Sequence, residues 1–524
     1  MFTQRSSRTP RRRFLRAVTA IGAVCLLAAC SSGDGGSAGS GTPDSSGTLK
    51  TGWTTAITSL DPHLATSEVA SFRFGLNQIY DRLFTVKADG TVDGMLVEDY
   101  SYSDDGMDLI LDLREDVTFR DGAPLDAEAV KVNLDRARTL DSPAVKSRLV
   151  PMRDVSVTGP YQVTVGLVEP TDVIPYVLSE VGGFVMHPDL IKNGDPATEA
   201  NGSGAYSVES FAPGEAMTIV RDRDDYWDND AAQIARIEYT AISDTQAFTN
   251  AMAGGQIELG QFLPGTTTAL EGRDGLVTVP VPSGIGVELY LNREEEPLDD
   301  VKVRQAINHA YDRDLIVESL YPGSEARHQH SRTGLPGYDE SLEDLYPFDT
   351  ERAKQLLAEA GHPDGIDLGE VIIVNVVTPG VADVIQEQFS QAGIRMTPIV
   401  KDGLEGPMAF GRGEASAMLH YSPLGTSFTS GSNRRWGPQL NPAGVTPEYE
   451  QMIGDATDPR LPEEERATAA ADLNAYLVEE AWSAPLVWVT YPWVMSEKVG
   501  NFNSEMDYFT TLGPFDLRYV TVTE

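Results

Sequence analysis

Few residues in this chain are of the types that catalyse reactions or bind metals. There are two cysteines, Cys25 and Cys30, and seven histidines among 524 residues. No HExxH, S-x-x-K or Walker A pattern is present. His328 and His330 flank Gln329, a spacing that suits either a shared metal ion or a solvated polar loop. We expect the solvated loop, and therefore neither a metal site nor a cofactor.

The cysteines lie at the end of a short apolar segment near the N-terminus. Residues 1–16 contain six arginines and no acidic residue, and Ala17–Ala29 is apolar. A permanent membrane span needs about 20 apolar residues, so this segment is too short to be one. A basic stretch before a short apolar stretch is typical of an export signal. We predict a signal peptide over residues 1–29.

The four residues Leu27-Ala28-Ala29-Cys30 resemble a bacterial lipobox. In that motif the peptide is cut before the cysteine, whose thiol is acylated, and two or more acyl chains anchor a protein stably. We therefore predict lipidation of Cys30, removal of Cys25 with the signal, and a flexible Ser/Gly-rich linker up to residue 47. Arg11-Arg12-Arg13 also resembles a twin-arginine motif, so both export routes stay open.

The overall charge limits the possible partners. The formal net charge is −39, with 23% charged and 41% hydrophobic residues, a composition typical of soluble globular proteins. Such an acidic chain is unsuited to nucleic acid or to anionic lipid. We expect the lipid on Cys30 to supply the membrane attachment, which places the protein on the extracytoplasmic face of the cell membrane. The chain length suggests about three domains.

The local patterns predict a mixture of strands and helices. Leu109, Leu111 and Leu113 alternate with polar residues, as in a half-buried strand. Aspartates at four positions precede helical patterns and are suited to cap them: Asp126, Asp300, Asp312 and Asp349. Strand and helix patterns alternate along the second half of the chain, which predicts an α/β (α+β) fold.

Several fragments together resemble the extracytoplasmic solute-binding proteins of ABC importers, specifically the oligopeptide/dipeptide/nickel-type family (family 5). They occur in the order of that family between residues 48 and 490, and most have a plain structural role as turns or core residues. We expect Arg304 and Arg313 among them to pair with nearby acids. The fragments include Leu60-Asp61-Pro62-His63, Tyr80-Asp81-Arg82-Leu83, Leu113–Phe119, Gly202–Tyr206, Tyr226-Trp227, Leu291-Asn292, Asp300–Ile307 and Ala353–Gly361.

The resemblance implies a two-lobed periplasmic-binding-protein-like fold with an extra domain on the first lobe. Solute lies between the lobes, hinge closure buries it, and a permease with ATPase subunits receives it. We expect a monomer without enzymatic activity. The implied first lobe is residues 48–80, 201–286 and 492–524; the extra domain is residues 81–200, and the second lobe is residues 287–491.

The resemblance implies that the second lobe contributes a strand and a loop to the solute site. The matching segment here is Ser416–Pro438. It has no acidic residue, although peptide-binding members usually place one there, so a solute other than an ordinary peptide stays open. Its aromatic residues suit stacking on a solute or packing in a core, and its arginine pair suits a carboxylate or a solvated surface. Trp53, Thr54 and Thr55 should face the site from the first lobe. The second-lobe candidates are His420, Tyr421, Arg434, Arg435 and Trp436.

The default solute is a peptide or a peptide-like molecule. A sugar, an opine-like solute or a metal chelate is also compatible with the fold. The main alternative from another class is an exported hydrolase, such as a glycosidase with two carboxylates. A glycosidase is defined by the distance in space between its two catalytic carboxylates. The sequence contains many acidic residues and does not show which two lie at that distance. A receptor of the same fold that signals without a permease is a further alternative.

Overall fold

A computed structural model describes the structure of residues 42–64, 75–87, 89–140, 143–403, 405–423, 427–437, 440–502 and 516–523. The predicted signal peptide, the lipobox and most of the linker lie outside these residues. Across the described segments, none of the helices combines the length and the apolar character that crossing a membrane would require.

The largest element is a mixed sheet of 11 strands in the order β15-β14-β16-β12-β17-β11-β1-β10-β9-β8, with β13 also paired to β17. The pairs β14–β15, β14–β16, β1–β10 and β1–β11 are parallel. The strands are β1 (Thr48–Trp53), β8 (Ser207–Ala212), β9 (Ala216–Val220), β10 (Arg236–Ala241), β11 (Leu259–Gln261), β12 (Leu276–Leu291), β13 (Glu325–Ala326), β14 (Ile366–Val374), β15 (Ile394–Lys401), β16 (Ala417–Pro423) and β17 (Ser483–Ser496).

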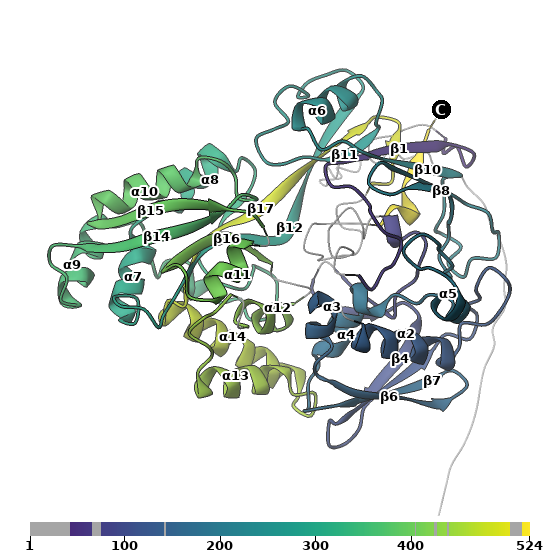
Figure 1. Ribbon diagram of the computed structural model, residues 1–524, viewed down its shortest axis with the longest axis horizontal. Helices are drawn as coiled ribbons and strands as arrows, with labels where there is room; N and C mark the ends of the chain where they lie inside the picture. Colours follow the sequence, from purple (N-terminus) through teal and green to yellow (C-terminus); the bar gives the residue numbers. More distant parts are fainter. Residues whose placement is uncertain are drawn as a thin grey trace, which may run out of the picture. The chain divides into compact units, whose positions relative to one another are not determined.

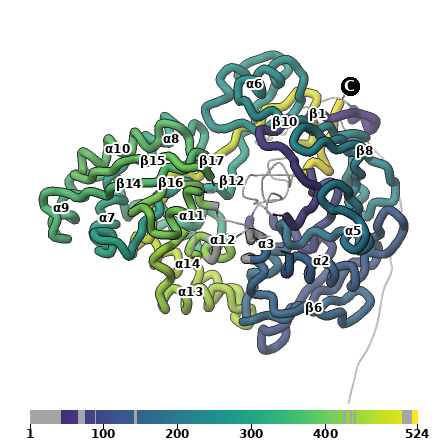
Figure 2. The backbone as a smooth tube through the Cα atoms, in the orientation of Figure 1, coloured from purple at the N-terminus to yellow at the C-terminus, as the bar shows by residue number. Residues whose placement is uncertain are grey.

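The strands β12 and β17 are the long central pair of this sheet and run side by side (Figure 2). Their antiparallel register shifts between Pro282 and Gly286, so the ladder is irregular at that point. The predicted lobe boundaries at residues 286/287 and 491/492 fall inside these two strands. Those boundaries stay a prediction, but a break in the ladder is where a pair of crossing strands bends most easily.

Two groups of helices cover opposite faces of the β14–β15–β16 part of the sheet (Figure 1). Ile316 of α8 and Phe389 of α10 belong to one hydrophobic cluster, and Phe410 of α11 and Leu473 of α14 belong to another. The helices are α7 (Val301–His309), α8 (Arg313–Leu320), α9 (Thr350–Glu359), α10 (Val381–Gln391), α11 (Glu405–Gly411), α12 (Phe428–Arg435), α13 (Pro447–Thr457) and α14 (Glu463–Glu479).

A separate sheet has the order β4-β5-β7-β6 and lies within the predicted extra domain. The predicted half-buried strand is confirmed as β5, where Leu109, Leu111 and Leu113 are buried. The elements are β4 (Val97–Tyr102), β5 (Asp108–Leu113), β6 (Met152–Gly159), β7 (Gln162–Leu167), α2 (Ala127–Thr139), α3 (Pro143–Arg148), α4 (Val173–Leu178) and α5 (Pro188–Asn193). Outside both large sheets lie α6 (Thr245–Ala253) and the short strands β2 (Phe84–Val86), β3 (Val92–Gly94), β18 (Val499–Gly500) and β19 (Thr521–Val522).

The predicted helix caps are confirmed. The carboxylates of Asp126, Asp300, Asp312 and Asp349 accept backbone N–H groups in the first turns of α2, α7, α8 and α9. Such caps form because a short acidic side chain satisfies an N–H that has no partner within the helix.

The expected pairing with acids is confirmed for Arg304, which forms an ion pair with Glu480, and is wrong for Arg313. Arg313 donates to the backbone oxygens of Arg327, Pro485 and Asn308 among others, and no ion pair is found for it among the described residues. Arg304 likewise donates mainly to carbonyls, with the Glu480 carboxylate at 3.7 Å. A guanidinium has five N–H donors, so one buried arginine can tie together several chain segments without a carboxylate.

Candidate functional site

The charged residue buried most unexpectedly is Glu288, near the C-terminal end of β12. Its neighbours Val287 and Leu289 face the hydrophobic cluster of α8 and α10, and Tyr290 belongs to the opposite cluster. Since side chains alternate along a strand, Glu288 shares the face of Tyr290, towards α11 and α12. Its exposed fraction is 0%. A carboxylate at such a place requires compensating charges.

Two arginines supply those charges. Arg435 Nε lies 3.2 Å from Glu288 Oε1, and Arg327 Nη2 lies 3.5 Å from Glu288 Oε2. The Ser483 hydroxyl donates to Oε2 at 3.1 Å, and His330 Nδ1 lies 3.7 Å from the same oxygen. Both guanidinium groups and the histidine ring are as deeply buried as the carboxylate. We call Glu288, Arg327, His330 and Arg435 the Glu288 cluster.

Distant parts of the chain bring these residues together. Arg435 is the last residue of α12, whereas Arg327 and His330 belong to the loop after β13. The Arg327 guanidinium lies over the Trp488 ring, 4.0 Å from its centroid. Gly286 makes room for it, because a Cβ there would lie 2.2 Å from Arg327 Nη1. The position of Arg327 is therefore set by close packing on two strands.

The electrostatics of the Glu288 cluster fix its charge state. Burial by itself raises the pKa of the Glu288 carboxyl, but Arg435 and Arg327 outweigh burial and hold that pKa well below its usual range. Burial lowers the pKa of His330 to about 4 and that of Arg327 to about 10. At neutral pH the cluster therefore consists of one carboxylate, two guanidinium cations and a neutral imidazole.

Several polar atoms of the cluster have no hydrogen-bond partner among the residues that the structure describes. They are Oε1 of Glu288, the three guanidinium nitrogens of Arg435, Nη1 and Nη2 of Arg327, both ring nitrogens of His330 and, beside them, Nε1 of Trp436. Buried polar groups in proteins are nearly always paired with protein or water. This cluster is thus a place where a further polar group belongs, and we take it as the candidate functional site.

The predicted second-lobe residues divide between the two faces of the sheet. His420 pairs with Glu288 in the β12–β16 ladder, and Tyr421 pairs with Val287. Tyr421 packs against the cluster that contains Val287 and Leu419, on the face away from Glu288. The two neighbours therefore point to opposite sides, and Tyr421 does not face the Glu288 cluster.

Trp436 is a core aromatic, one of the two alternatives for this residue. Only 3% of it is exposed, and its ring meets Trp482 at 5.3 Å and His330 at 5.6 Å. Arg435 is buried, so the solvated-surface alternative is wrong for it; the Arg434 side chain lies outside the described part of the structure. The expectation of a solvated loop is also wrong for His330, which is fully buried.

The first-lobe candidates lie at the end of β1. Trp53 is buried and its ring meets Trp493 of β17 edge-on at 5.8 Å, while Thr54 and Thr55 are exposed. Strand β17 contacts both Trp53 and the Glu288 cluster. Its residue Trp493, near one end, packs on Trp53, and Ser483, at the other end, donates to Glu288. The described residues contain no group of three or more His, Cys, Asp or Glu suited to a metal ion.

Glu288 and Arg327 are not among the residues that the sequence predicts for the site. The segment Gly286-Val287-Glu288-Leu289-Tyr290 places one carboxylate among the uncharged residues of β12. An acidic residue at the buried position of such a run is a usable indication of a partner cation. Nothing local to Arg327 or Arg435 indicates that either is that partner.

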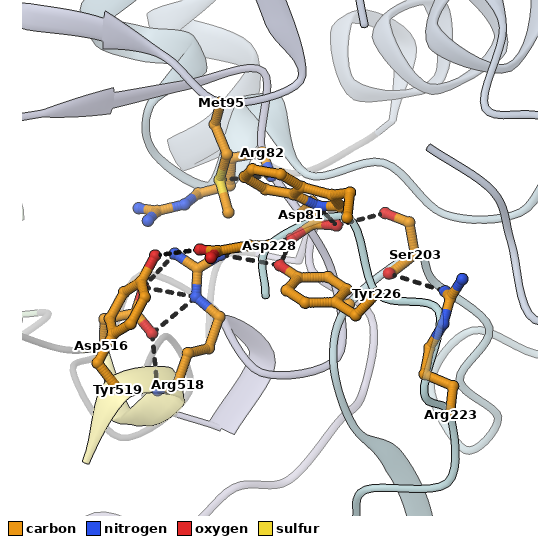
Figure 3. Close-up of polar contacts among 12 residues, drawn as sticks. Asp81, Arg82, Met95, Ser203, Arg223, Tyr226, Asp228, Asp516, Arg518 and Tyr519 are labelled. Carbon is orange, nitrogen blue, oxygen red and sulfur yellow. Dashed lines mark hydrogen bonds and ion pairs between the residues drawn. The ribbon is translucent and has the colours of Figure 1, made fainter. Parts of the chain in front are cut away.

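A second buried charged cluster surrounds Asp81 (Figure 3). Asp81 accepts hydrogen bonds from Tyr226 Oη at 2.7 Å, Ser203 Oγ at 2.8 Å and Trp227 Nε1 at 3.1 Å. Arg518 lies 3.6 Å from it, donates to Tyr226 Oη at 3.0 Å and pairs with Asp516. We call these residues the Asp81 cluster. The carboxylates, hydroxyls and guanidinium group of this cluster all have hydrogen-bond or ion-pair partners. A cluster whose polar groups are all paired stabilises the fold.

The family is decided by a comparison of the chain with family models. Residues 91–421 match the model of the bacterial extracellular solute-binding proteins, family 5. The chain belongs to this family. It is therefore a family 5 substrate-binding protein of ABC importers.

Known family 5 proteins and their structural relatives resemble the chain over most of its length. The glutathione-binding protein GsiB of Salmonella paratyphi A is 26% identical over 385 residues, 72% of this chain and 74% of GsiB. Among solved structures, NikA of Brucella suis with Fe(III)-EDTA is 24% identical with a TM-score of 0.79, covering 91% of this chain and 100% of NikA. DppA of Helicobacter pylori with the peptide STSA is 19% identical with a TM-score of 0.75, covering 91% and 98%.

These structural likenesses establish the mixed α/β, two-lobed periplasmic-binding-protein-like fold. The relatives are solute-binding proteins, so this family 5 member is a binding protein rather than an enzyme. The alternative of an exported hydrolase is therefore wrong. The family is extracellular, in keeping with the expected export.

Proposed function

We propose that this protein is a lipid-anchored receptor that captures a peptide-like solute between its lobes and delivers it to an ABC permease with its ATPase subunits. The observation that carries the proposal is the family match over residues 91–421. Relatives whose names specify glutathione or whose structures hold a peptide support a peptide-like solute. A monomer suffices for this task.

In this proposal Cys30 carries the acyl chains that hold the acidic body at the membrane. The proposed solute contacts comprise Trp53, Thr54 and Thr55 from the first lobe and His420, Arg434 and Arg435 from the second, with Glu288 and Arg327 added by their position beside Arg435. Tyr421 and Trp436 remain candidates for contact only if closure or a rotamer change brings their rings to the solute, since both pack in hydrophobic clusters.

The test is mass spectrometry of small molecules released when the protein, purified from its native host, is denatured. A peptide-like molecule present at about one per chain supports the proposal. A sugar or a metal chelate in its place contradicts the solute class and leaves the receptor function standing. Binding of the recovered molecule should also raise the thermal midpoint with its concentration, as mass action requires.

The anchor is tested separately by fractionation of Cys30→Ser. We expect the variant to leave the membrane fraction or to stay unprocessed. A variant that remains in the membrane fraction in its processed form would contradict lipid anchoring.

A further inference from the structure

The predicted extra domain and the predicted second lobe touch at the start of α4. The backbone N–H of Asp172 donates to the carbonyl oxygen of Thr457, the last residue of α13, at 2.7 Å. The carboxylate of Asp172 accepts a hydrogen bond from Arg466 Nη1 of α14 at 2.9 Å. Asp172 and Arg466 are 294 residues apart in the chain, so only the tertiary structure brings them together.

The turn between β4 and β5 reaches the same part of the second lobe. A Cβ atom on Gly106 in this turn would lie 3.1 Å from Arg460 Cγ and 3.0 Å from Pro170 Cβ. Arg460 belongs to the connection between α13 and α14, and its guanidinium group pairs with Asp458. The aliphatic part of Arg460 therefore packs on the turn. We call these interactions, together with those of Asp172, the Asp172 contact.

The two parts that meet at the Asp172 contact belong to different sheets. Among the described residues, no strand pairing joins the four-stranded sheet of the extra domain to the large sheet, and the second lobe continues into the first through β12 and β17. The ladder of these two strands is irregular between Pro282 and Gly286, where they bend most easily. A bend at that point would move the second lobe and part the Asp172 contact.

The Asp172 contact is held weakly enough to part. The side chains of Asp172 and Arg466 are 21% and 24% exposed, and Asp172 Oδ1 is buried without a hydrogen-bond partner among the described residues. Burial raises the pKa of the Asp172 carboxyl to about 7, although Arg466 acts in the opposite direction. The carboxylate thus gains an ion pair and loses water, two effects of similar size. The Asp81 cluster, by contrast, has partners for its polar groups.

We propose that the Asp172 contact is a latch by which the extra domain holds the second lobe in the closed position, so that this domain takes part in solute capture without touching the solute. This proposal rests on the proposed function, since it presupposes capture by closure of the lobes. The apparent affinity of a receptor falls with the populated fraction of its binding-competent form. Loss of the latch should therefore weaken capture while every solute contact stays intact.

The test needs no solute, because it measures the open and closed populations of the full mature chain. With Cys30→Ser the mature chain has no cysteine, so spin labels attach only to Ser156→Cys on β6 and Gln355→Cys on α9, both exposed positions. Pulsed spin-label distance measurements at about pH 8, above the pKa of Asp172, give the two populations. We expect Arg466→Met to lower the ratio of closed to open chains about two- to fivefold, as for a partly exposed ion pair.

The control for Arg466→Met is Arg395→Met. Arg395 is an exposed arginine that pairs with Asp367 inside the second lobe and does not reach the extra domain. Its substitution removes the same kind of ion pair and should leave the distance distribution unchanged.

A substitution on the other side of the contact tests the latch independently. In Gly106→Ala the new Cβ presses on Arg460 and Pro170, so the closed population should fall. Gly122→Ala is the matched control, because both glycines lie in turns of the extra domain with positive φ, at 71° and 83°, and a Cβ on Gly122 meets nothing within 4 Å. If Gly106→Ala fails to fold, Arg466→Met and Asp172→Asn still decide the question.

Amide hydrogen exchange at Asp172 reports the same opening at one atom, since this N–H donates to Thr457. Exchange there should accelerate in Arg466→Met, while the amides of β5 and β7 keep their protection. Faster exchange without a change in the label distances would show a local contact rather than a latch and would overturn the proposal. Unchanged distances in Arg466→Met and Asp172→Asn, or a single long distance in the unaltered chain, would also overturn it.

The outcome for the latch is separable from that for the receptor function. If a solute is recovered from the native host and the variants leave the distances unchanged, the latch fails and the receptor stands. If the variants open the chain and no solute is recovered, the contact between the extra domain and the second lobe stands, and the proposed capture of a peptide-like solute fails.

Discussion

The Asp81 and Glu288 clusters are both built from charged residues withdrawn from water, yet they complete their hydrogen bonds differently. Asp81 is surrounded by donors from Ser203, Tyr226 and Trp227, with Arg518 close by, and these donors are matched by acceptors (Figure 3). Around Glu288 the guanidinium nitrogens outnumber the acceptors. Burying charge is therefore not by itself an indication of function, and the two clusters differ in how many of their polar atoms have partners.

The largest effect is expected from breaking the saturated cluster. Asp81→Ala removes the acceptor of three hydrogen bonds and leaves Arg518 with less compensation, so the free energy of unfolding should fall by about 3–5 kcal/mol. Denaturant unfolding measures it, with the exposed Asp104→Ala as the control. A loss below about 1 kcal/mol would mean that the Asp81 cluster does not stabilise the fold appreciably.

The packing beneath Arg327 can be broken without removing a charge. In Gly286→Ala the new Cβ would lie 2.2 Å from Arg327 Nη1, so the guanidinium must move. Overpacking of this kind should lower the free energy of unfolding by about 1–3 kcal/mol. Gly454→Ala is the matched control, because that glycine lies in α13 with nothing within 4 Å of its Cβ position. Equal behaviour of the two variants would show that the position of Arg327 is not set by Gly286.

Acid should distinguish the clusters, because only the Glu288 cluster contains a histidine. The pKa of His330 is lowered from 6.5 to about 4 by burial, so the unfolded chain binds the proton first as pH falls. Stability should therefore decrease from pH 6.5 to 4, by up to about 1.4 kcal/mol per pH unit from this residue.

The measurement is the difference in unfolding free energy between the unaltered chain and His330→Asn at several pH values. The difference isolates His330 from groups that titrate in the opposite sense, such as Asp172, whose pKa is raised to about 7 by burial. The variant should lose stability less steeply with acid. Parallel curves would mean that the pKa of His330 is the same in the folded and the unfolded chain, so that burial does not lower it.

The smallest effect is expected where an ion pair is partly exposed. Arg466 Nη1 donates to Asp172 Oδ2 at 2.9 Å, and their side chains are 24% and 21% exposed. Since solvent screens such a pair, Arg466→Met should change the free energy of unfolding by no more than about 1 kcal/mol. A loss as large as that of Asp81→Ala would show that burial does not separate strong pairs from weak ones in this protein.

Much of the fold was predictable because its determinants are local or repeated. An aspartate that caps a helix acts within three residues, so Asp126 and Asp312 identify the starts of α2 and α8. The alternation of Leu109, Leu111 and Leu113 likewise predicts which side of β5 is buried. The family resemblance added the two lobes, since it depends on short fragments in a fixed order rather than on any single site.

The candidate site was predicted only in part, because its residues depend on the tertiary structure. Arg435 was named, but its partner Glu288 comes from a neighbouring strand and Arg327 from the loop after β13. Adjacent residues of a strand point to opposite faces, so His420 and Tyr421 look equivalent in the sequence and are separated by the sheet.

By itself the sequence determined the helix starts, the alternating strand, the family and the candidate lipid-attachment cysteine, because each depends on neighbouring residues or on their order along the chain. Only the tertiary structure decided which cations face Glu288, which of their nitrogens keep a partner, and that His330 is buried. The physical reason is that hydrogen-bond saturation is a property of atoms brought together from β12, the loop after β13 and α12, and no local pattern encodes the distance between them.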